Sequence, residues 1–156
     1  MADGSELPAP TGSLTPFLTV KNAEAAIAFY REAFGAVELF RLSEPSGKIG
    51  HAELRIGDAL LLLNDEYPDF GALSPVAIGG SPVKLHLYVE DVDAVVARAV
   101  AAGATLLRPV KDGFYDGDRS GLVADPSGHA WFIATRKEEV TPAEMQRRWD
   151  VVLQAG

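Results

Sequence analysis

LTPFLTVKNAEAAIAFYREAFG, residues 14–35, has the same pattern as VKLHLYVEDVDAVVARAVAAG, residues 83–103. Each stretch reads as a short strand, a residue that can cap a helix (Asn22 or Asp91), an amphipathic helix and a glycine that ends the helix. The two stretches superpose with a single gap. Self-similarity of this kind predicts two modules of the same structure in one chain.

Three strand-like runs follow each of these stretches. They are AVELFRL, KIGHAELRI and ALLLLND in the first half, and TLLRPV, SGLVAD and AWFIATR in the second. The dipeptide Gly57-Asp58 and the DPSG turn at residues 125–128 mark two of the turns between strands. The sequence therefore predicts an α+β fold of two βαβββ modules, with helices over residues 23–34 and 92–102.

The remaining segments connect or flank these modules. YPDFGALSPVAIGGSP is rich in Gly and Pro and has no periodic pattern, which indicates a connecting loop. Thr141 and Glu144 form a capping box with proline at the first helical position, so a terminal helix is predicted. We expect a flexible N-terminus (1–12), a first module (13–66), the connecting loop (67–82), a second module (83–137) and a C-terminal helix (138–156).

Composition narrows the classes of function. The chain has 156 residues and no cysteine, which excludes disulfides, thiolate zinc sites and cysteine nucleophiles. Its formal net charge of -8 would repel a phosphate backbone, so nucleic acid is not expected as a partner. Because the N-terminal sequence lacks a signal-peptide pattern and no apolar run is long enough for a membrane span, we expect a cytoplasmic protein.

Four motifs carry a resemblance to a known family. With AIAFYREAFG, HAELRIGD, LHLYVEDVDAV and DPSGHAW in this order, the chain resembles the vicinal oxygen chelate superfamily, which includes glyoxalases, bleomycin-resistance proteins, fosfomycin-resistance enzymes and extradiol dioxygenases. The resemblance covers roughly residues 13–137 and is nearest to the PhnB-like branch. It implies sheets that curl into a half-barrel around a cavity, and a homodimer.

The resemblance also implies positions for a metal. Metal-binding members carry four ligands, which here fall at Thr15, Leu62 (or Leu61), Lys84 and Phe132. A threonine hydroxyl is a weak ligand, leucine and phenylalanine offer no donor, and a protonated lysine repels a cation. We therefore expect no metal at these positions and no cofactor, as in the bleomycin-binding members.

The alternation of side chains along each strand predicts which residues line the cavity. Leu54 and Leu87 belong to the apolar faces that pack on the helices, so their neighbours His51, Glu53 and His86 point the other way. A two-residue turn at Gly57-Asp58 pairs Glu53 with Leu62. The predicted ligand-binding residues are Thr15, Phe17, His51, Glu53, Arg55, Leu62, Lys84, His86, Tyr88, Tyr115, Arg119 and Phe132.

The sequence leaves the role of three of these residues open. His51, Glu53 and His86 are candidates for a displaced metal site, for acid-base catalysis, or for a polar wall that recognises a ligand. Arg119 can clamp an anionic group or pair with Asp118. His129 is expected to stabilise the DPSG turn, and Trp131 to belong to the core.

Our interpretation is a homodimeric, metal-free protein that holds a small organic molecule, aromatic or antibiotic-like, in its concave cavity. Phe70, Met145 and Trp149, which a monomer would have difficulty covering, favour the dimer. The alternative is a lyase, isomerase or dioxygenase that uses a divalent metal held by His51, Glu53 and His86. A third class, a scaffold that interacts through its terminal helix, is also considered, and the sequence leaves open whether the protein is an enzyme.

Overall fold

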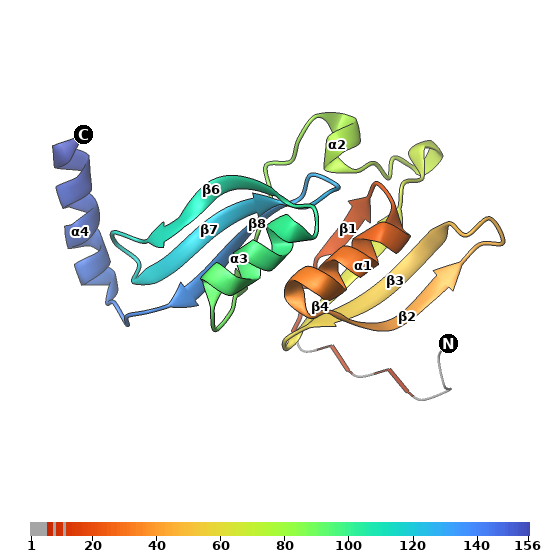
Figure 1. Cartoon of the computed structure of the whole chain (residues 1–156), viewed down its shortest axis with the longest axis horizontal. Helices are drawn as coiled ribbons and strands as arrows, with labels where there is room; N and C mark the ends of the chain where they lie inside the picture. The colour runs from red at the N-terminus through yellow and green to blue at the C-terminus, as the bar shows by residue number, and fades with distance from the viewer. Residues whose placement is uncertain (1–5, 8, 11) are drawn as a thin grey trace.

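The computed structural model describes residues 6–7, 9–10 and 12–156, so the prediction of a flexible segment over residues 1–12 falls largely outside the described residues. The chain forms two βαβββ modules that lie next to each other, followed by a C-terminal helix (Figure 1). The first module consists of β1 (Phe17–Val20), α1 (Ala23–Phe34), β2 (Val37–Ser43), β3 (Ile49–Ile56) and β4 (Ala59–Asp65). The second consists of β5 (Lys84–Tyr88), α3 (Val92–Ala101), β6 (Thr105–Asp112), β7 (Asp118–Ala124) and β8 (Ala130–Arg136). The predicted fold class is thereby confirmed.

The two sheets have the same topology. Their strand orders are β1-β4-β3-β2 and β5-β8-β7-β6, with the first strand of each module parallel to the last and all other pairs antiparallel. Ile56 pairs with Ala59 across the two-residue turn, and Glu53 pairs with Leu62. The predicted register of this hairpin is confirmed.

Helix α1 begins and ends where the sequence predicts, and α3 begins as predicted but ends one residue earlier, at Ala101. The side chains of Asn22 and Asp91 accept hydrogen bonds from the N–H groups of Ala25 and Ala94, which stabilises the first turns of α1 and α3. After α1, Gly35 takes a left-handed conformation with φ of 68° and its N–H bonds back to the last turn.

The segment between the modules is more ordered than predicted. It contains a 3-10 turn, η1 (Pro68–Phe70), and a one-turn helix, α2 (Pro75–Ile78), where we expected a connecting loop. Ser74 caps α2 and Pro75 occupies its first position. A helix of one turn is too short to produce a 3.6-residue pattern, and for this reason periodicity does not reveal it.

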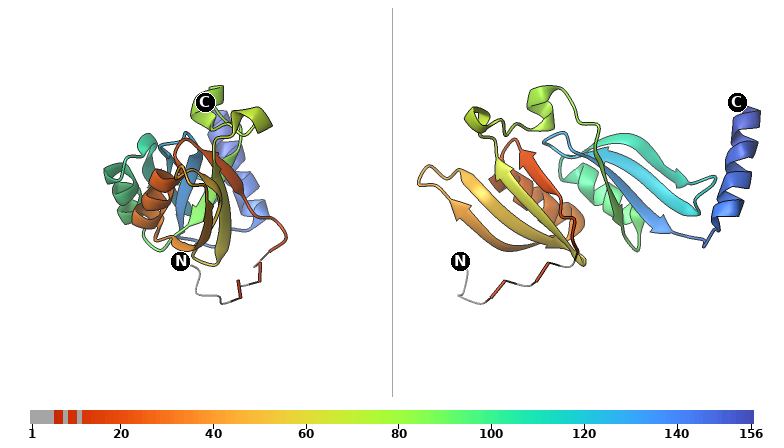
Figure 2. Two further views of the ribbon diagram at one scale, coloured as in Figure 1. Left: turned by 90° about the vertical axis from the view of Figure 1, so that its right-hand side faces the viewer. Right: turned by 180° about the vertical axis from the view of Figure 1, so that it is seen from behind.

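A single hydrophobic core joins the modules. In it, Trp131 of β8 packs against Tyr30 and Phe34 of α1, with ring centroids 5.5 and 4.8 Å apart. Trp131 therefore belongs to the core, as predicted. Helices α1 and α3 lie beside each other on one side of the molecule, and the opposite faces of both sheets are free of helices (Figure 2).

The DPSG turn also connects the modules. Asp125 accepts hydrogen bonds from the backbone N–H groups of Ser127 and His129, which holds the turn. The ring of His129 lies 2.8 Å from the carbonyl oxygen of Thr19 at the end of β1. His129 thus takes part in the turn, and its ring links the turn to the first module.

Helix α4 (Pro142–Ala155) extends away from the second sheet at one end of the molecule (Figure 1). The hydroxyl of Thr141 accepts a hydrogen bond from the N–H of Glu144, as the capping box predicts. Trp149 contacts Phe114 and Tyr115 in the loop between β6 and β7, at centroid distances of 6.0 and 5.2 Å. None of the helices in the described ranges combines the length and the apolar character that a membrane crossing requires.

Candidate functional site

The uncovered face of the first sheet carries His51 and Glu53. Both point away from α1, because Ala52 and Leu54, which alternate with them in β3, are fully buried. His51 Nε2 lies 3.2 Å from Glu53 Oε1, and the ring of Phe17 lies 5.6 Å from the His51 ring. This arrangement forms a polar pair bordered by an aromatic ring.

His86 lies on the uncovered face of the second sheet. Its ring centroid lies 4.7 Å from that of Tyr88 and 6.1 Å from that of Phe132. His86 therefore belongs to a different sheet from His51 and Glu53, and aromatic rings are its neighbours. Within the described part of the chain, no three His, Asp or Glu side chains lie close enough to hold a metal ion.

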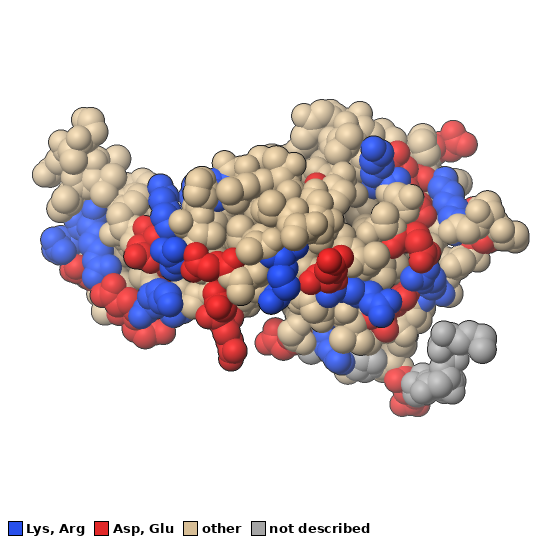
Figure 3. All heavy atoms as spheres, viewed as in Figure 1, with Lys and Arg blue, Asp and Glu red and all other residues tan. Residues whose placement is uncertain are grey.

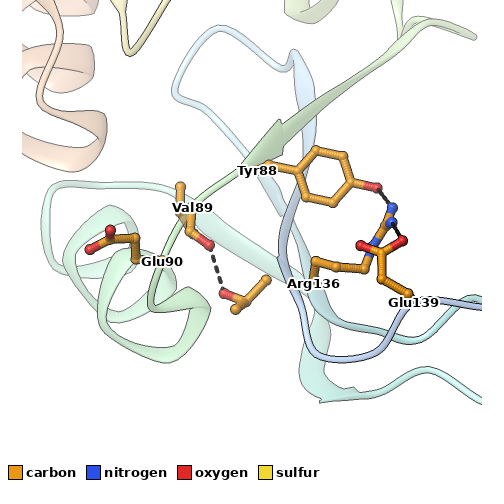
Figure 4. A pocket seen from close by; sticks show the side chains of 6 residues that line it. Tyr88, Val89, Glu90, Arg136 and Glu139 are labelled. Atoms are coloured by element: carbon orange, nitrogen blue, oxygen red, sulfur yellow. Dashed lines mark hydrogen bonds and ion pairs between the residues drawn. The ribbon is translucent and has the colours of Figure 1, made fainter.

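A larger hollow lies at the C-terminal ends of β5 and β8, and its arginine is already paired with acidic side chains. It has a volume of about 760 Å³ and is lined by Tyr88, Val89, Glu90, Thr135, Arg136 and Glu139 (Figure 4). Arg136 donates to Asp118 at 2.6 Å and to the Tyr88 hydroxyl at 2.9 Å, and it lies 3.6 Å from Glu139. Bonding to Asp118 raises the pKa of Arg136 above its ordinary value. The positive charge of Arg136 is therefore already neutralised by acidic side chains and is not free to bind an anionic ligand.

Of the two roles considered for Arg119, the pairing with Asp118 is wrong. Arg119 instead binds Asp93 of α3 in a bidentate pair at 2.9 and 3.0 Å, and Asp112 at 3.2 Å. Neighbours along a strand point to opposite faces, so Asp118 reaches Tyr88 and Arg136 while Arg119 reaches α3. The same contact lowers the pKa of Asp93.

A smaller pocket of about 200 Å³ lies between β5, β6, β8 and the loop after β6. It is lined by His86, Arg108, Lys111, Gly113, Phe114, Tyr115, Asp116, Ser120 and Phe132. His86, Tyr115 and Phe132 are among the residues predicted from the sequence. Arg108, Lys111 and Ser120 were not predicted.

The alternation of side chains along β6 does not predict that Arg108 lies in this pocket, because a β-bulge interrupts the strand. The pairing of β6 with β7 shifts between Leu106 and Arg108, so that Leu106 pairs with Val123 and Arg108 pairs with Leu122. Val123 is buried in the core, whereas Leu122 points to the other face. One extra residue thus moves Arg108 onto the uncovered face, which simple alternation does not predict. Its guanidinium lies 5.0 Å from the Phe132 ring.

The other predicted residues lie outside this pocket. Thr15 precedes β1, Phe17 lies in β1, Arg55 in β3, Leu62 in β4, and Lys84 and Tyr88 in β5. Leu62 pairs with Phe17 on one side and Glu53 on the other, so these three residues form one group. The predicted set therefore separates into a group on each sheet.

Known proteins share this architecture. The model of the Glyoxalase/Bleomycin resistance protein/Dioxygenase superfamily matches residues 12–133. The chain belongs to this superfamily. An uncharacterised protein of Mycobacterium bovis is 45% identical to it over 137 residues, covering 86% of this chain and 90% of that protein.

Several solved structures resemble the chain in fold. The structure of a gene product of Arabidopsis thaliana has a TM-score of 0.63 and 29% identity, covering 79% of this chain and 98% of that one. TioX from Micromonospora sp. ML1 has a TM-score of 0.60 and 28% identity, covering 80% and 99%. These similarities support the assignment of the two βαβββ modules.

The glyoxalase superfamily includes metal-binding members, but the residues of this chain do not fit a metal at the family positions. Thr15, Leu62, Lys84 and Phe132 offer a single hydroxyl oxygen as a neutral ligand, whereas a catalytic zinc site uses three His, Asp, Glu or Cys ligands. Leu61, the alternative position, is buried and apolar. These side chains therefore do not support a metal at the family positions.

Proposed function

We propose that this protein binds a small organic molecule, aromatic or amphipathic, in the pocket between β5, β6 and β8, without the metal of the superfamily. The motifs that carry the resemblance also favour a place in the PhnB-like branch. Both uncovered sheet faces contribute to recognition in this proposal, the second through the pocket and the first through His51 and Glu53.

The observation that supports the proposal best is the lining of the pocket. Aromatic rings from β8 and from the loop after β6, namely Phe132, Phe114 and Tyr115, surround a space next to the polar side chains of Arg108 and Ser120. Ligand sites typically combine apolar walls with a few polar groups that fix orientation. Trp149 of α4 packs on two of these rings, which connects the terminal helix to the same site.

The proposal also includes a homodimer. Large apolar side chains are exposed on the uncovered face and on α4, among them Phe17 at 51%, Trp149 at 42% and Leu153 at 63%. A second copy of the chain would cover such residues, and closed twofold dimers are the commonest assembly of soluble proteins.

The test uses 1-naphthol, a neutral amphipathic aromatic probe, and isothermal titration calorimetry. We expect saturable binding that Phe132→Ala weakens by about tenfold or more, because the ring supplies part of the pocket wall. Phe70→Ala is the matched control, since Phe70 is 86% exposed in the connecting segment and lies outside the pocket. Equal affinity in both variants would contradict the proposed site.

Elemental analysis of protein purified without chelator tests whether the protein binds a metal. We expect no stoichiometric transition metal. One metal per chain that disappears in His51→Ala or His86→Ala would instead support the metal-dependent lyase, isomerase or dioxygenase.

A further inference from the structure

The pocket between β5, β6 and β8 contains an excess of positive charge. Arg108 and Lys111 are the two cationic residues that line it, and Asp116 is the one acidic residue among the lining side chains. The Oδ1 atom of Asp116 already accepts a hydrogen bond from the backbone N–H of Asp118 at 3.0 Å. The carboxylate of Asp116 therefore stabilises the local turn.

Arg108 is half-buried and has no partner of opposite charge among the described residues. Among the described residues its guanidinium makes one hydrogen bond, from Nη2 to the hydroxyl of Ser120 at 2.9 Å, and it has no ion pair. Its Nε atom is a buried side-chain polar atom without any partner. An arginine side chain has five N–H donors, and buried donors are nearly always satisfied in folded proteins.

The nearby carboxylates do not neutralise Arg108 or Lys111. Asp112 lies 3.2 Å from Arg119, and Asp118 lies 2.6 Å from Arg136. Five arginines of the described chain are paired with acids: Arg41, Arg119, Arg136, Arg147 and Arg148. Arg108, which lines a pocket, is instead held against the face of the Phe132 ring, 5.0 Å from its centroid, and bonded to Ser120. A partner of opposite charge is missing from this site within the described residues.

We infer that this pocket selects a planar organic anion, an aromatic carboxylate or a compound of the same chemistry. The anionic group binds the guanidinium of Arg108 and the ammonium of Lys111, and the ring of the ligand packs against Phe132, Phe114 and Tyr115. A carboxylate matches the fork of the guanidinium, and the charge-assisted bonds gain strength in a partly desolvated pocket. This inference rests on the proposed function, because it specifies the class of molecule that the same pocket binds.

The experiment compares benzoate with benzamide, which has the same shape and no charge. Affinities are measured by isothermal titration calorimetry for the unchanged protein and for Arg108→Gln, with Arg31→Gln as the control. Arg31 is an exposed residue near the end of α1, so the control removes the same charge far from the pocket. Circular dichroism and thermal unfolding establish that both variants are folded.

We expect benzoate to bind at least about tenfold more tightly than benzamide, and Arg108→Gln to remove this preference, as the strength of hydrogen bonds to charged groups implies. Arg31→Gln should retain the preference. Added NaCl should weaken binding of benzoate more than binding of benzamide, because salt screens the ion pair. If Arg108→Gln does not fold, Lys111→Gln, which changes an exposed lining residue, replaces it in the same comparison.

The outcomes separate this inference from the proposed function. Equal binding of benzoate and benzamide, both weakened by Phe132→Ala, would overturn the selection of an anion while the pocket keeps its function. A preference for benzoate that is the same in Arg108→Gln and Lys111→Gln as in Arg31→Gln would also overturn it. Absence of binding of both compounds and of 1-naphthol at millimolar concentration would overturn the inference and the proposed function together.

Discussion

Asp125 is one of the residues whose hydrogen bonds join the two modules. It is 5% exposed, and its carboxylate accepts from the hydroxyl of Tyr30 at 2.5 Å and from Trp131 Nε1 at 3.0 Å. The backbone N–H groups of Ser127, in the DPSG turn, and of His129, just after it, bind its other oxygen. A buried carboxylate is stable here because each oxygen has more than one donor.

Asp125→Ala should therefore destabilise the protein by about 2–5 kcal/mol, because it leaves the buried donors of Tyr30 and Trp131 without an acceptor. Urea unfolding followed by circular dichroism measures this loss. Asp69→Ala, at an exposed position of η1, is the control and should change the free energy of unfolding by less than about 0.5 kcal/mol. Similar losses in the two variants would show that the buried network does not contribute to stability.

Tyr30 should make the stability depend on pH in the alkaline range. Burial, followed by the negative charge of Asp125, raises the pKa of the Tyr30 hydroxyl well above 10.0. The unfolded chain then loses this proton at lower pH than the folded protein, so the free energy of unfolding should fall as pH rises through the unfolded pKa of about 10. Urea unfolding between neutral pH and about pH 11, just above that unfolded value, measures the slope. Tyr30→Phe should show a smaller decrease over this range, and an unchanged slope would contradict the assignment.

The β6–β7 loop and the segment before α4 are held together by close backbone contacts at Gly117. Its carbonyl oxygen accepts from the N–H groups of Lys137 and Glu138, at 2.9 and 3.1 Å. Gly117 has φ of 77°, and a Cβ atom at this position would lie 2.4 Å from the carbonyl oxygen of Glu138. Only glycine permits both this conformation and this approach.

Gly117→Ala should consequently cost more than Gly47→Ala, which is the matched control. Gly47 has φ of 90°, but a Cβ atom there would have no neighbouring atom within 4 Å, so alanine costs about 1–2 kcal/mol for the left-handed conformation alone. We expect Gly117→Ala to lose at least about 1–3 kcal/mol more, as overpacking typically does. Thermal unfolding measures both. Equal losses of stability in the two variants would indicate that the β6–β7 loop moves away from Glu138 at no cost.

Sequence patterns predict the elements well where turns are short and strands regular. The pairing of Glu53 with Leu62 follows from the two-residue turn, because the side-chain period of a strand then fixes every later pair. The position of Arg108 could not be predicted in this way, since a bulge adds one residue and changes the face. The pair between Arg119 and Asp93 depends on the packing of α3 against β7, which no local pattern contains.

At the scale of the whole molecule, the two modules leave one side of both sheets uncovered. Helices α1 and α3 lie on the opposite side, so apolar residues on the uncovered side have no covering layer in the described chain (Figure 2). On the face seen in Figure 3, acidic and basic side chains alternate over the modules, and a largely uncharged area lies over α2. Val76 and Ile78 of α2 are 55% and 62% exposed.

Helix α4 provides a further argument for a second copy of the chain. It has 14 residues and none of them is buried. Isolated helices of this length are marginal in water, and most helices gain stability by packing an apolar face. Trp149 makes aromatic contacts with the second module, while Val152 and Leu153 remain exposed at 39% and 63%. A partner that covers the end of α4 would stabilise both the helix and the pocket wall on which Trp149 packs.

We therefore predict a dimer, with a mass twice the 16.6 kDa of one chain in light scattering at micromolar concentration. Leu153→Lys places a charge in the proposed interface and should weaken dimerisation by about tenfold or more, because an unpaired buried charge is costly. Gln154→Lys adds the same charge at the neighbouring exposed position and is the control. A mass of 16.6 kDa for the unchanged protein would contradict the dimer. If the dimer forms but Leu153→Lys and Gln154→Lys dissociate alike, α4 does not form the interface, and the uncovered sheet faces become the surface through which the copies associate.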